Sequence, residues 1–309
     1  MDAQPKKYFM KLISKEIEFK YGKKILFNEK LSNYSWFNLG GPSDVLFKPS
    51  NVEDIIFFFK NVKPKKIIIL GAGSNTLIRD GGVKGVTIKL GSQFSYLNLP
   101  SSNIIETGAA TLDKKIADFA LENSLTGLEF LACIPGSIGG AIRMNSGCYG
   151  ENISQILYSI NVIDIFGNKK EIPASDIKFH YRDSNLNQNL IITSVKLQGK
   201  VFPKELIQKK QQDLIEKKKN SQPSQIKTCG STFKNTENKK AWELIKESNC
   251  ENYQIGSAKI SKKHCNFFVN EGKATAKELE DLINKVKETV YQKTNINLEL
   301  EIRIIGHNI

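Results

Sequence analysis

Short apolar runs separated by glycine-rich turns alternate with amphipathic segments along the whole chain. The clearest run is Ile67-Ile68-Ile69-Leu70, whose β-branched residues predict a buried strand. A glycine-rich loop at 71–75 follows, the apolar pattern resumes at 76–78, and residues 79–82 turn the chain again. We therefore predict a strand, a loop, a short turn and a second strand. A Rossmann unit is not expected, because Thr76 occupies the position of its third glycine and no helical pattern follows.

The loop Gly71-Ala72-Gly73-Ser74-Asn75 is the first candidate binding element. Glycines allow positive φ angles, so that neighbouring backbone N–H groups can converge on one point. Such a concave arrangement binds anions, above all phosphate oxygens. A tight turn between two strands is the alternative, although two glycine turns around Ser-Asn are more than a hairpin needs.

The residues before this loop predict a small α/β unit. Apolar residues between positions 12 and 19 have helical spacing, and a strand is expected at 44–47. Ser50 and Glu53 form a capping-box pattern at the start of a helix through 55–59.

The middle of the chain predicts a second unit with more strand. Strands are expected at 104–108, 159–166 and 191–197, and Thr111 can cap a helix that follows the first of them. Glycines are dense between residues 133 and 150. This density predicts a close approach of the backbone to a ligand.

The last part of the chain predicts a third unit. A lysine-rich helix is expected from Pro203 to Lys219, followed by a linker. Thr275 and Glu278 form another capping-box pattern, and residues 298–306 alternate like a strand. The expected domains are 1–90, 91–200 and 201–309.

The large positive net charge of the chain says little about its binding partners. The formal net charge is +13 over 309 residues, but only four of the 45 basic residues are arginine. A lysine-coated surface without arginine clusters or interleaved aromatic residues is poorly suited to reading bases, so nucleic-acid binding is not expected. The same bias makes each arginine informative, since arginine offers a planar, bidentate cation that lysine does not.

Cysteine and histidine usage argues against a metal site and against export. The five cysteines form no CxxC pair, and the three histidines share no ligand spacing. We expect reduced thiols and no metal. No apolar run approaches a membrane span, and Met1–Lys11 lacks the apolar core of a signal peptide. We therefore expect a cytoplasmic protein without membrane insertion.

Six motifs occur in a fixed order between about Leu31 and Gly306. They are Asn38-Leu39-Gly40-Gly41-Pro42, Gly71–Asn75, Pro135-Gly136-Ser137-Ile138-Gly139-Gly140-Ala141, Tyr181-Arg182-Asp183-Ser184, Gly230-Ser231-Thr232-Phe233-Lys234-Asn235 and Glu301–Gly306. In these motifs the chain resembles the UDP-N-acetylenolpyruvoylglucosamine reductases. The short segment between Arg182 and Ser231 resembles the form without a tyrosine-loop insertion. Cys133 and Cys229 depart from the small Gly or Ala that the resemblance leads us to expect, and Leu300 stands where part of the family has proline.

The resemblance implies an α+β protein with an FAD-binding domain of the vanillyl-alcohol-oxidase (PCMH) type in two subdomains and a C-terminal α+β substrate domain. It implies non-covalent FAD, and NADPH as the electron donor. The implied enzyme is a flavoprotein oxidoreductase that reduces UDP-N-acetylglucosamine enolpyruvate to UDP-N-acetylmuramate, for peptidoglycan. NADPH would reduce the flavin, and hydride would pass to the methylene carbon of the enol ether. The implied partner is thus a UDP-sugar, and protein partners are left open.

The resemblance also implies roles for particular residues. Arg182 would grip the carboxylate or enolate, Ser231 would give the proton, and Glu301 would polarise or proton-couple the site opposite Arg182. Lys234 and Asn235 would contact the substrate. The implied cofactor-binding residues are Gly71, Ala72, Gly73, Ser74, Asn75, Gly108, Ala109, Pro135, Gly136, Ser137, Gly139, Gly140 and Asn145.

Two other functions remain open at this point. Another flavin oxidoreductase of the same fold could act on a sugar or alcohol, although no histidine lies in either glycine loop to tether a flavin. A basic binding protein without catalysis would contain no chromophore and would bind nucleic acid in a salt-sensitive way.

Overall fold

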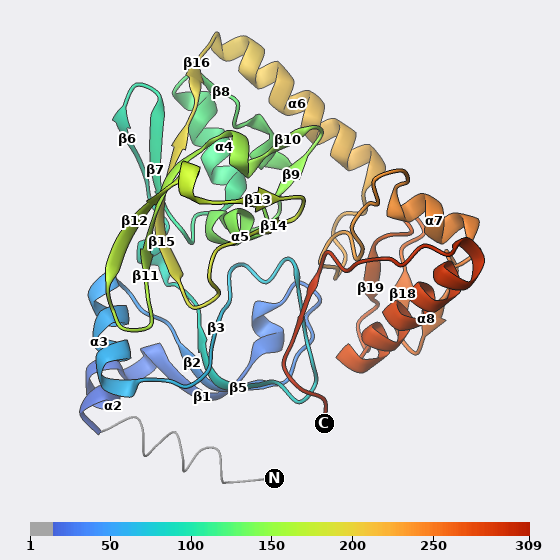
Figure 1. Ribbon diagram of the computed structural model, residues 1–309, viewed down its shortest axis with the longest axis horizontal. Coiled ribbons are helices and arrows are strands. Elements are labelled where there is room, and N and C mark those ends of the chain that lie inside the picture. Colours follow the sequence, from blue (N-terminus) through green and yellow to red (C-terminus); the bar gives the residue numbers. More distant parts are fainter. Residues whose placement is uncertain (1–14) are drawn as a thin grey trace. The chain divides into compact units, whose positions relative to one another are not determined.

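The computed structural model describes residues 15–309, which form two compact units (Figure 1). The first unit contains the described residues up to Asn28, then Asp44–Ala72 and Gly85–Lys218; the second contains Glu29–Ser43, Gly73–Lys84 and Lys219–Ile309. The segment Met1–Lys11 and the first part of the predicted N-terminal helix lie outside the described residues. The division into three domains at residues 90 and 200 stays a prediction.

The first sheet of the first unit has four strands in the order β1-β2-β5-β3 (Figure 1). They are β1 (Ile25–Lys30), β2 (Pro42–Phe47), β5 (Val83–Ile88) and β3 (Ile67–Ile69), and β3 runs parallel to β5. Helices α2 (Lys15–Tyr21) and α3 (Val52–Val62) share an apolar core with this sheet, in which the rings of Phe47 and Phe58 stack at 4.2 Å. The predicted strand forms over Ile67–Ile69 and stops before Leu70, and its three residues are half-buried rather than buried. No helix follows the glycine loop directly, as expected.

The predicted start of α3 is wrong by one residue. Asn51, not Ser50, is the N-cap, and its side chain accepts a hydrogen bond from Asp54 N–H at 2.8 Å. Asp54 in turn accepts from Ser50 N–H at 2.8 Å. The pair Asn51 and Asp54 therefore replaces Ser50 and Glu53, because asparagine is as good a cap as serine.

The second sheet of the first unit has five strands in the order β12-β11-β15-β7-β6, all paired antiparallel. They are β12 (Lys169–Pro173), β11 (Leu157–Ile163), β15 (Ile191–Gln198), β7 (Ile104–Gly108) and β6 (Leu97–Ser101). Helices α4 (Asp113–Glu122) and α5 (Ile138–Arg143) share its apolar core. Figure 1 shows both helices beside this sheet. Thr111 does not cap α4, contrary to prediction: Leu112 is the N-cap, and the Thr111 hydroxyl donates to Tyr96 O at 3.2 Å.

Three two-stranded pairs complete the strands of the first unit. They are β8 (Leu125–Thr126) with β16 (Lys200–Val201), β9 (Gly147–Cys148) with β10 (Glu151–Asn152), and β13 (Phe179–His180) with β14 (Asp183–Ser184). The predicted lysine-rich helix is confirmed as α6 (Lys204–Ser221), which extends two residues further than expected.

The second unit is built around one long helix, α8 (Ala276–Thr294). It packs against the antiparallel sheet β17 (Gln254–Ile255), β18 (Ala258–Ile260) and β19 (Phe268–Asn270), with α7 (Ala241–Glu247) beside it. A parallel pair joins β4 (Thr76–Ile78) to β20 (Arg303–Ile305). The capping box of Thr275 and Glu278 is confirmed, with 3.0 Å for each of its two bonds. This mixture of helices and mainly antiparallel sheets confirms the α+β class.

The turn after β4 is tied to the start of α8. Asp80 accepts hydrogen bonds from Ala276 N–H and Lys277 N–H, both at 3.0 Å. Arg79 forms a bidentate pair with Glu280, with Nε–Oε2 at 2.8 Å and Nη2–Oε1 at 2.6 Å. The scarcity of arginine led us to expect a bidentate need at arginine positions, and Arg79 meets that expectation.

The alternating pattern at 298–306 only partly forms a strand. Residues Arg303–Ile305 are β20, but Glu301 lies in a bend before it. The prediction that Glu301 sits within a regular strand is therefore wrong. Its backbone instead forms hydrogen bonds with two other segments of the second unit.

The Arg79–Glu280 pair should contribute measurably to stability. Replacing Glu280 by Gln removes the charge but keeps the shape, and should lower the free energy of unfolding by about 1–3 kcal/mol, because a hydrogen-bonded, partly buried ion pair is lost. Chemical denaturation of the purified variant measures this.

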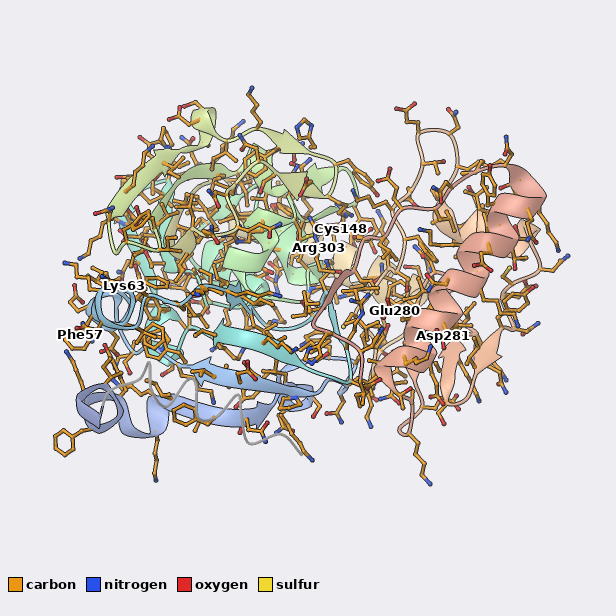
Figure 2. All side chains as sticks on the ribbon, turned by 60° about the horizontal axis from the view of Figure 1, so that its bottom comes forward. Phe57, Lys63, Cys148, Glu280, Asp281 and Arg303 are labelled. Atoms are coloured by element: carbon orange, nitrogen blue, oxygen red, sulfur yellow. The ribbon has the colours of Figure 1, made fainter. Side chains whose placement is uncertain are left out.

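Asp281→Asn is the matched control on the next residue of α8 (Figure 2). Asp281 pairs with Lys277 at 2.8 Å on an exposed helix face, so its loss should cost less than about 0.5 kcal/mol. Equal losses for the two variants would contradict this account of Arg79.

Candidate functional site

The first candidate loop begins in the first unit with Gly71. A Cβ added there would lie 3.1 Å from Ser137 Oγ, so this position is next to the second glycine-rich stretch. The Gly71 carbonyl accepts a hydrogen bond from Lys89 Nζ at 2.6 Å. Burial lowers the pKa of Lys89, and the nearby charge of Lys48 lowers it further. Sequence analysis did not single out Lys89, because only the sheet brings the residue after β5 beside the loop after β3.

Backbone hydrogen bonds join the second glycine-rich stretch to the residues that follow β7. Gly139 N–H donates to Ala109 O, and Ile138 N–H donates to Thr111 O, both at 3.0 Å. A Cβ on Gly139 would approach Ala109 O to 3.0 Å, so a larger residue would push these segments apart. The structure therefore brings together three predicted elements, the residues at 71, at 108–109 and at 135–140.

Gly140 differs from its neighbours because one side of its Cα is open. Within 4 Å of a Cβ built there, only Ser137 Oγ is found, at 3.9 Å, among the residues that the structure describes. Its lack of a side chain is thus not demanded by protein packing. A ligand that needs close backbone contact fits that open face.

Asp113 is the first residue of α4 and connects this helix to the second glycine-rich stretch. Its N–H donates to Gly136 O at 3.2 Å, and its side chain is buried. Neither carboxyl oxygen has a hydrogen-bond partner among residues 15–309, and burial raises the pKa of Asp113 well above its usual range. The neutral, protonated form is therefore favoured in the folded protein. The sequence pattern alone gave no sign of this.

The side chain of Asn145 forms hydrogen bonds with two other parts of the protein. Its Nδ2 donates to His180 O at 3.1 Å, and its Oδ1 accepts from Ser154 N–H at 3.0 Å. Its backbone has φ = 39°, a left-handed conformation that asparagine tolerates better than most residues. The side chain thus fixes the course of the chain after α5.

Arg182 occupies the two-residue turn between β13 and β14. Its φ of 57° places it in the left-handed region, and its guanidinium lies 4.9 Å from the ring of Tyr181. Nη2 donates to Gly147 O at 2.7 Å. The planar group is therefore oriented by the β9–β10 hairpin. Arg143, another of the scarce arginines, donates to the carbonyls of Asn187 and Leu190 and so fastens a loop.

The remaining part of the first loop, residues 73–75, belongs to the second unit. Gly73 has φ = 71°, and a Cβ there would fall 1.9 Å from Tyr34 O, so only glycine fits. Its carbonyl accepts from Trp36 N–H at 3.0 Å. Asn75 Nδ2 donates to Glu301 O at 3.0 Å, and Asn75 O accepts from Arg303 N–H at 2.9 Å.

Ser231 lies in the second unit on a backbone held from two sides. Gly230 before it has φ = 80°, and no described atom lies within 4 Å of a Cβ there. Ser231 bridges to Phe267, and Thr232 N–H donates to Asn266 O at 2.8 Å.

Asn266 clamps the residue after Thr232. Its Oδ1 accepts from Phe233 N–H at 3.0 Å, and its Nδ2 donates to Phe233 O at 2.9 Å. Asn266 is buried. Sequence analysis missed it, because only the folded chain sets it opposite the Gly230–Asn235 motif.

The segment around Glu301 runs along the other side of the Ser231 motif. Glu301 N–H donates to Thr232 O at 2.9 Å, and Lys234 N–H donates to Glu299 O at 2.8 Å. Phe233 also bridges to Leu300. The structure therefore places the Ser231 and Glu301 segments next to one another, as adjacent backbones of one unit.

Lys234 and Asn235 have protein contacts of their own. Lys234 Nζ lies 3.4 Å from Glu299 Oε2, an exposed carboxylate. Asn235 Oδ1 accepts from Ala241 N–H, the first residue of α7, at 3.0 Å. Asn235 thus helps to begin α7.

Metal-binding clusters and membrane-spanning helices are both absent from the described residues. In the part of the chain that the structure describes, no group of three or more His, Cys, Asp or Glu residues could hold a metal ion. Among residues 15–309, no helix is both long enough and apolar enough to cross a membrane.

Comparison with known protein families finds two matches. Residues 43–168 match a family described as FAD binding domain, and residues 222–305 match the C-terminal domain of UDP-N-acetylenolpyruvoylglucosamine reductase. The predicted combination of an FAD-binding domain with such a C-terminal domain is confirmed.

Individual relatives agree with these matches. The chain is 47% identical to UDP-N-acetylenolpyruvoylglucosamine reductase of Pelagibacter ubique over 91% of this chain and 95% of that protein. It is 43% identical to the enzyme of the same name from Wolbachia pipientis, over 89% of this chain and 94% of that protein. A crystal structure of UDP-N-acetylenolpyruvylglucosamine reductase from Thermus caldophilus superposes with a TM-score of 0.81 at 31% identity, covering 91% of this chain and 98% of that one.

The buried carboxyl of Asp113 predicts a pH dependence of stability. Its pKa is raised on folding, so the stabilising proton is fully bound below the unfolded pKa and is lost as the pH rises through the folded pKa. Asp113→Asn, which has no such proton to lose, should become more stable than the parent as the pH rises from about 4 to 8. A tenfold difference in proton affinity between the folded and unfolded states corresponds to about 1.4 kcal/mol. Denaturant unfolding at several pH values measures the difference.

Asp118→Asn serves as the control, because Asp118 is a partly exposed carboxylate on the same helix. This variant shows whether any Asp-to-Asn change on α4 gives the same curve as Asp113→Asn. Parallel pH curves for the parent and Asp113→Asn would contradict the assignment of a buried, protonated Asp113.

Proposed function

The chain belongs to the UDP-N-acetylenolpyruvoylglucosamine reductase family, and we propose that it reduces UDP-N-acetylglucosamine enolpyruvate to UDP-N-acetylmuramate for peptidoglycan synthesis. It does so as an FAD-dependent enzyme with NADPH as the electron donor. The observation that carries the proposal is the 47% identity to a reductase of this name over 91% of the chain. No observation favours the alternative of a sugar or alcohol oxidoreductase. The five free thiols suit a cytoplasmic enzyme.

The residues of the first unit fit a flavin nucleotide. Residues 71–72, 108–109 and 135–140 would hold the cofactor, with Gly140 offering its open face and Lys89 a positive charge near Gly71. The charge of Lys89 suits a pyrophosphate. Asn145 would act indirectly, by fixing the chain after α5. FAD bound there would, once reduced, supply the hydride for the methylene carbon of the substrate.

We assign Gly73, Ser74 and Asn75 to the same loop, with different tasks. Gly73 lies so close to Tyr34 O that only glycine fits at this position. Its first role is therefore to shape the turn. Asn75 secures Glu301 through its side chain. Support for a cofactor role of these three residues is the motif they share with Gly71 and Ala72.

Arg182 meets the main electrostatic need of the reaction. Negative charge develops on the carbon next to the reduced carbon and on its carboxylate, so a preoriented cation stabilises the transition state. The guanidinium is held by its bond to Gly147 O and lies over Tyr181, which limits its rotation. Its planar fork suits two carboxylate oxygens.

Ser231 would donate the proton that completes the reduction. Gly230 leaves open space before it, and the clamp of Asn266 on Phe233 holds the backbone in place. A serine hydroxyl is a weak acid, so precise placement must compensate. Glu301 is held against the same segment and would polarise the site, whereas Lys234 and Asn235 would contact the UDP-sugar.

Gly140 offers a test of the cofactor site. Gly140→Leu should leave the protein folded, because the Cβ position is open and leucine is the better helix former by about 1 kcal/mol. The same side chain should fill the space for the flavin and lower FAD affinity at least about tenfold, which corresponds to about 1.4 kcal/mol. FAD titration followed by absorbance and unfolding curves of the apoprotein measure the two effects separately. Unchanged FAD affinity in a folded variant would contradict the site.

Ser231→Ala tests the proton donor. Turnover of NADPH with the enolpyruvyl sugar should fall by about 10²–10⁴-fold in kcat, with little change in KM, because a transition-state proton donor is lost. Ser257→Ala, in the turn between β17 and β18, should retain full activity. A Ser231→Ala enzyme with the kcat of the parent would reject this role.

A further inference from the structure

Helix α6 is fixed on the first unit by side chains that share one of its faces. Ile207 and Leu214 are buried, and Gln211 Nε2 donates to Asp118 Oδ1 at 2.9 Å. Positions 207, 211 and 214 recur on one side of a helix. Because this side is held along two turns, the neighbouring positions of α6 have a firm support.

Lys210 extends from α6 to two carboxylates of the same unit. Its Nζ lies 2.7 Å from Glu151 Oε1 and 3.2 Å from Glu129 Oε2. Glu129 begins the 3₁₀ helix Glu129–Cys133, and its side chain is 1% exposed, whereas the side chain of Glu151 in β10 is 26% exposed. Figure 1 shows α6 beside β10. One ammonium group thus joins α6, a buried carboxylate and the β9–β10 hairpin.

The two carboxylates differ in how firmly they are fixed. Glu129 also accepts hydrogen bonds from the Thr126 hydroxyl and from Gly127 N–H. Both carboxylates lie within 3.2 Å of one nitrogen, so they would repel each other if that cation were removed. Because Glu129 is buried and anchored, the repulsion would displace Glu151 and the strand that contains it.

The backbone of Glu151 lies directly against Gly147. Asn152 pairs with Gly147 in the hairpin, and a Cβ on Gly147 would collide with Glu151 O. The Gly147 carbonyl accepts the 2.7 Å hydrogen bond from Arg182 Nη2. Through these residues a continuous series of contacts joins Lys210 to Arg182.

We propose that Lys210 is a positioning residue for Arg182, acting through Glu151 and the β9–β10 hairpin. While the ion pair is intact, the Gly147 carbonyl stays where it orients the guanidinium. Neither Lys210 nor Glu151 needs to touch the substrate. The effect on turnover rests on the proposed function and on the role of Arg182 in it, whereas the restraint of the hairpin does not.

Glu151→Ala tests the proposal and leaves the pair of Lys210 with the buried Glu129 in place. Bleaching of the FAD-loaded variant by NADPH should proceed at the rate of the parent. Recovery of colour with saturating enolpyruvyl sugar should slow at least about fivefold, because the charge that Arg182 stabilises develops only on that substrate. Anaerobic stopped-flow absorbance measures both steps. Unchanged recovery, or equal slowing of the two steps, overturns the proposal.

Matched variants separate this effect from the general loss of an ion pair. Glu171→Ala removes a carboxylate that pairs with Lys196 at 3.0 Å on β12, and it should recover colour at the rate of the parent. Glu151→Gln can still accept a hydrogen bond from Lys210, so its rate should be intermediate. A slowed Glu171→Ala, or a Glu151→Gln slower than Glu151→Ala, would contradict the proposal.

Hydrogen exchange tests the hairpin without reference to turnover. In the FAD-loaded protein, the amides of residues 147–152 should exchange faster in Glu151→Ala and in Lys210→Met, relative to residues 169–173 of β12. Lys209→Met, which changes the exposed lysine one position earlier on α6, should not alter this exchange. Lys210→Arg keeps a cation and should restore slow exchange. Unchanged exchange in the first two variants overturns the proposal.

Failure of the proposed function and failure of this inference are distinguishable. If the parent does not recover its colour with the enolpyruvyl sugar, the proposed function fails, and hydrogen exchange still decides whether Lys210 restrains the hairpin. If the parent recovers its colour and Glu151→Ala matches it in both steps, the proposed function stands and the inference fails.

Discussion

The backbone of Glu301 is the joint on which the second unit's candidate site depends. Its N–H donates to Thr232 O, and its carbonyl accepts from Asn75 Nδ2. Three segments far apart in sequence are thereby fixed by one residue, and each contains a motif of the family. Ser231 is a weak acid, so its proposed role depends on how firmly this joint and the Asn266 clamp hold its backbone.

In the first unit, close backbone approach plays the corresponding part. Gly71 and Gly139 have almost no room for a side chain, because Ser137 and Ala109 lie against them. Gly140, by contrast, keeps an open face, since only Ser137 Oγ lies within 4 Å of a Cβ built there among the described residues. The glycines of one motif therefore do two things: some bring loops together, and one leaves space. Arg182 donates to Gly147 O and Asn145 donates to His180 O, so that the β13–β14 turn is hydrogen-bonded to the residues that follow α5.

Sequence patterns predicted the elements that depend on neighbouring residues. Features that depend on contacts between distant parts of the chain could not be predicted in this way. The strand at 67–69 and the capping box of Thr275 follow from adjacent residues, and both are confirmed. The start of α3 was misplaced because Asn51 and Asp54 compete with an equivalent pattern one residue earlier. Glu301 left its predicted strand because Thr232 and Asn75 engage its backbone. Asn266 and Asp113 were missed, since no local pattern marks a residue whose partner lies elsewhere in the chain.

The most direct test of the proposed reduction is an anaerobic visible spectrum of the purified protein. The account predicts a yellow protein that NADPH bleaches, and whose colour returns only when UDP-N-acetylglucosamine enolpyruvate is added. A colourless protein that takes up no added FAD would contradict the flavin site. Bleaching that oxygen reverses but this substrate does not would leave the fold intact and contradict the function.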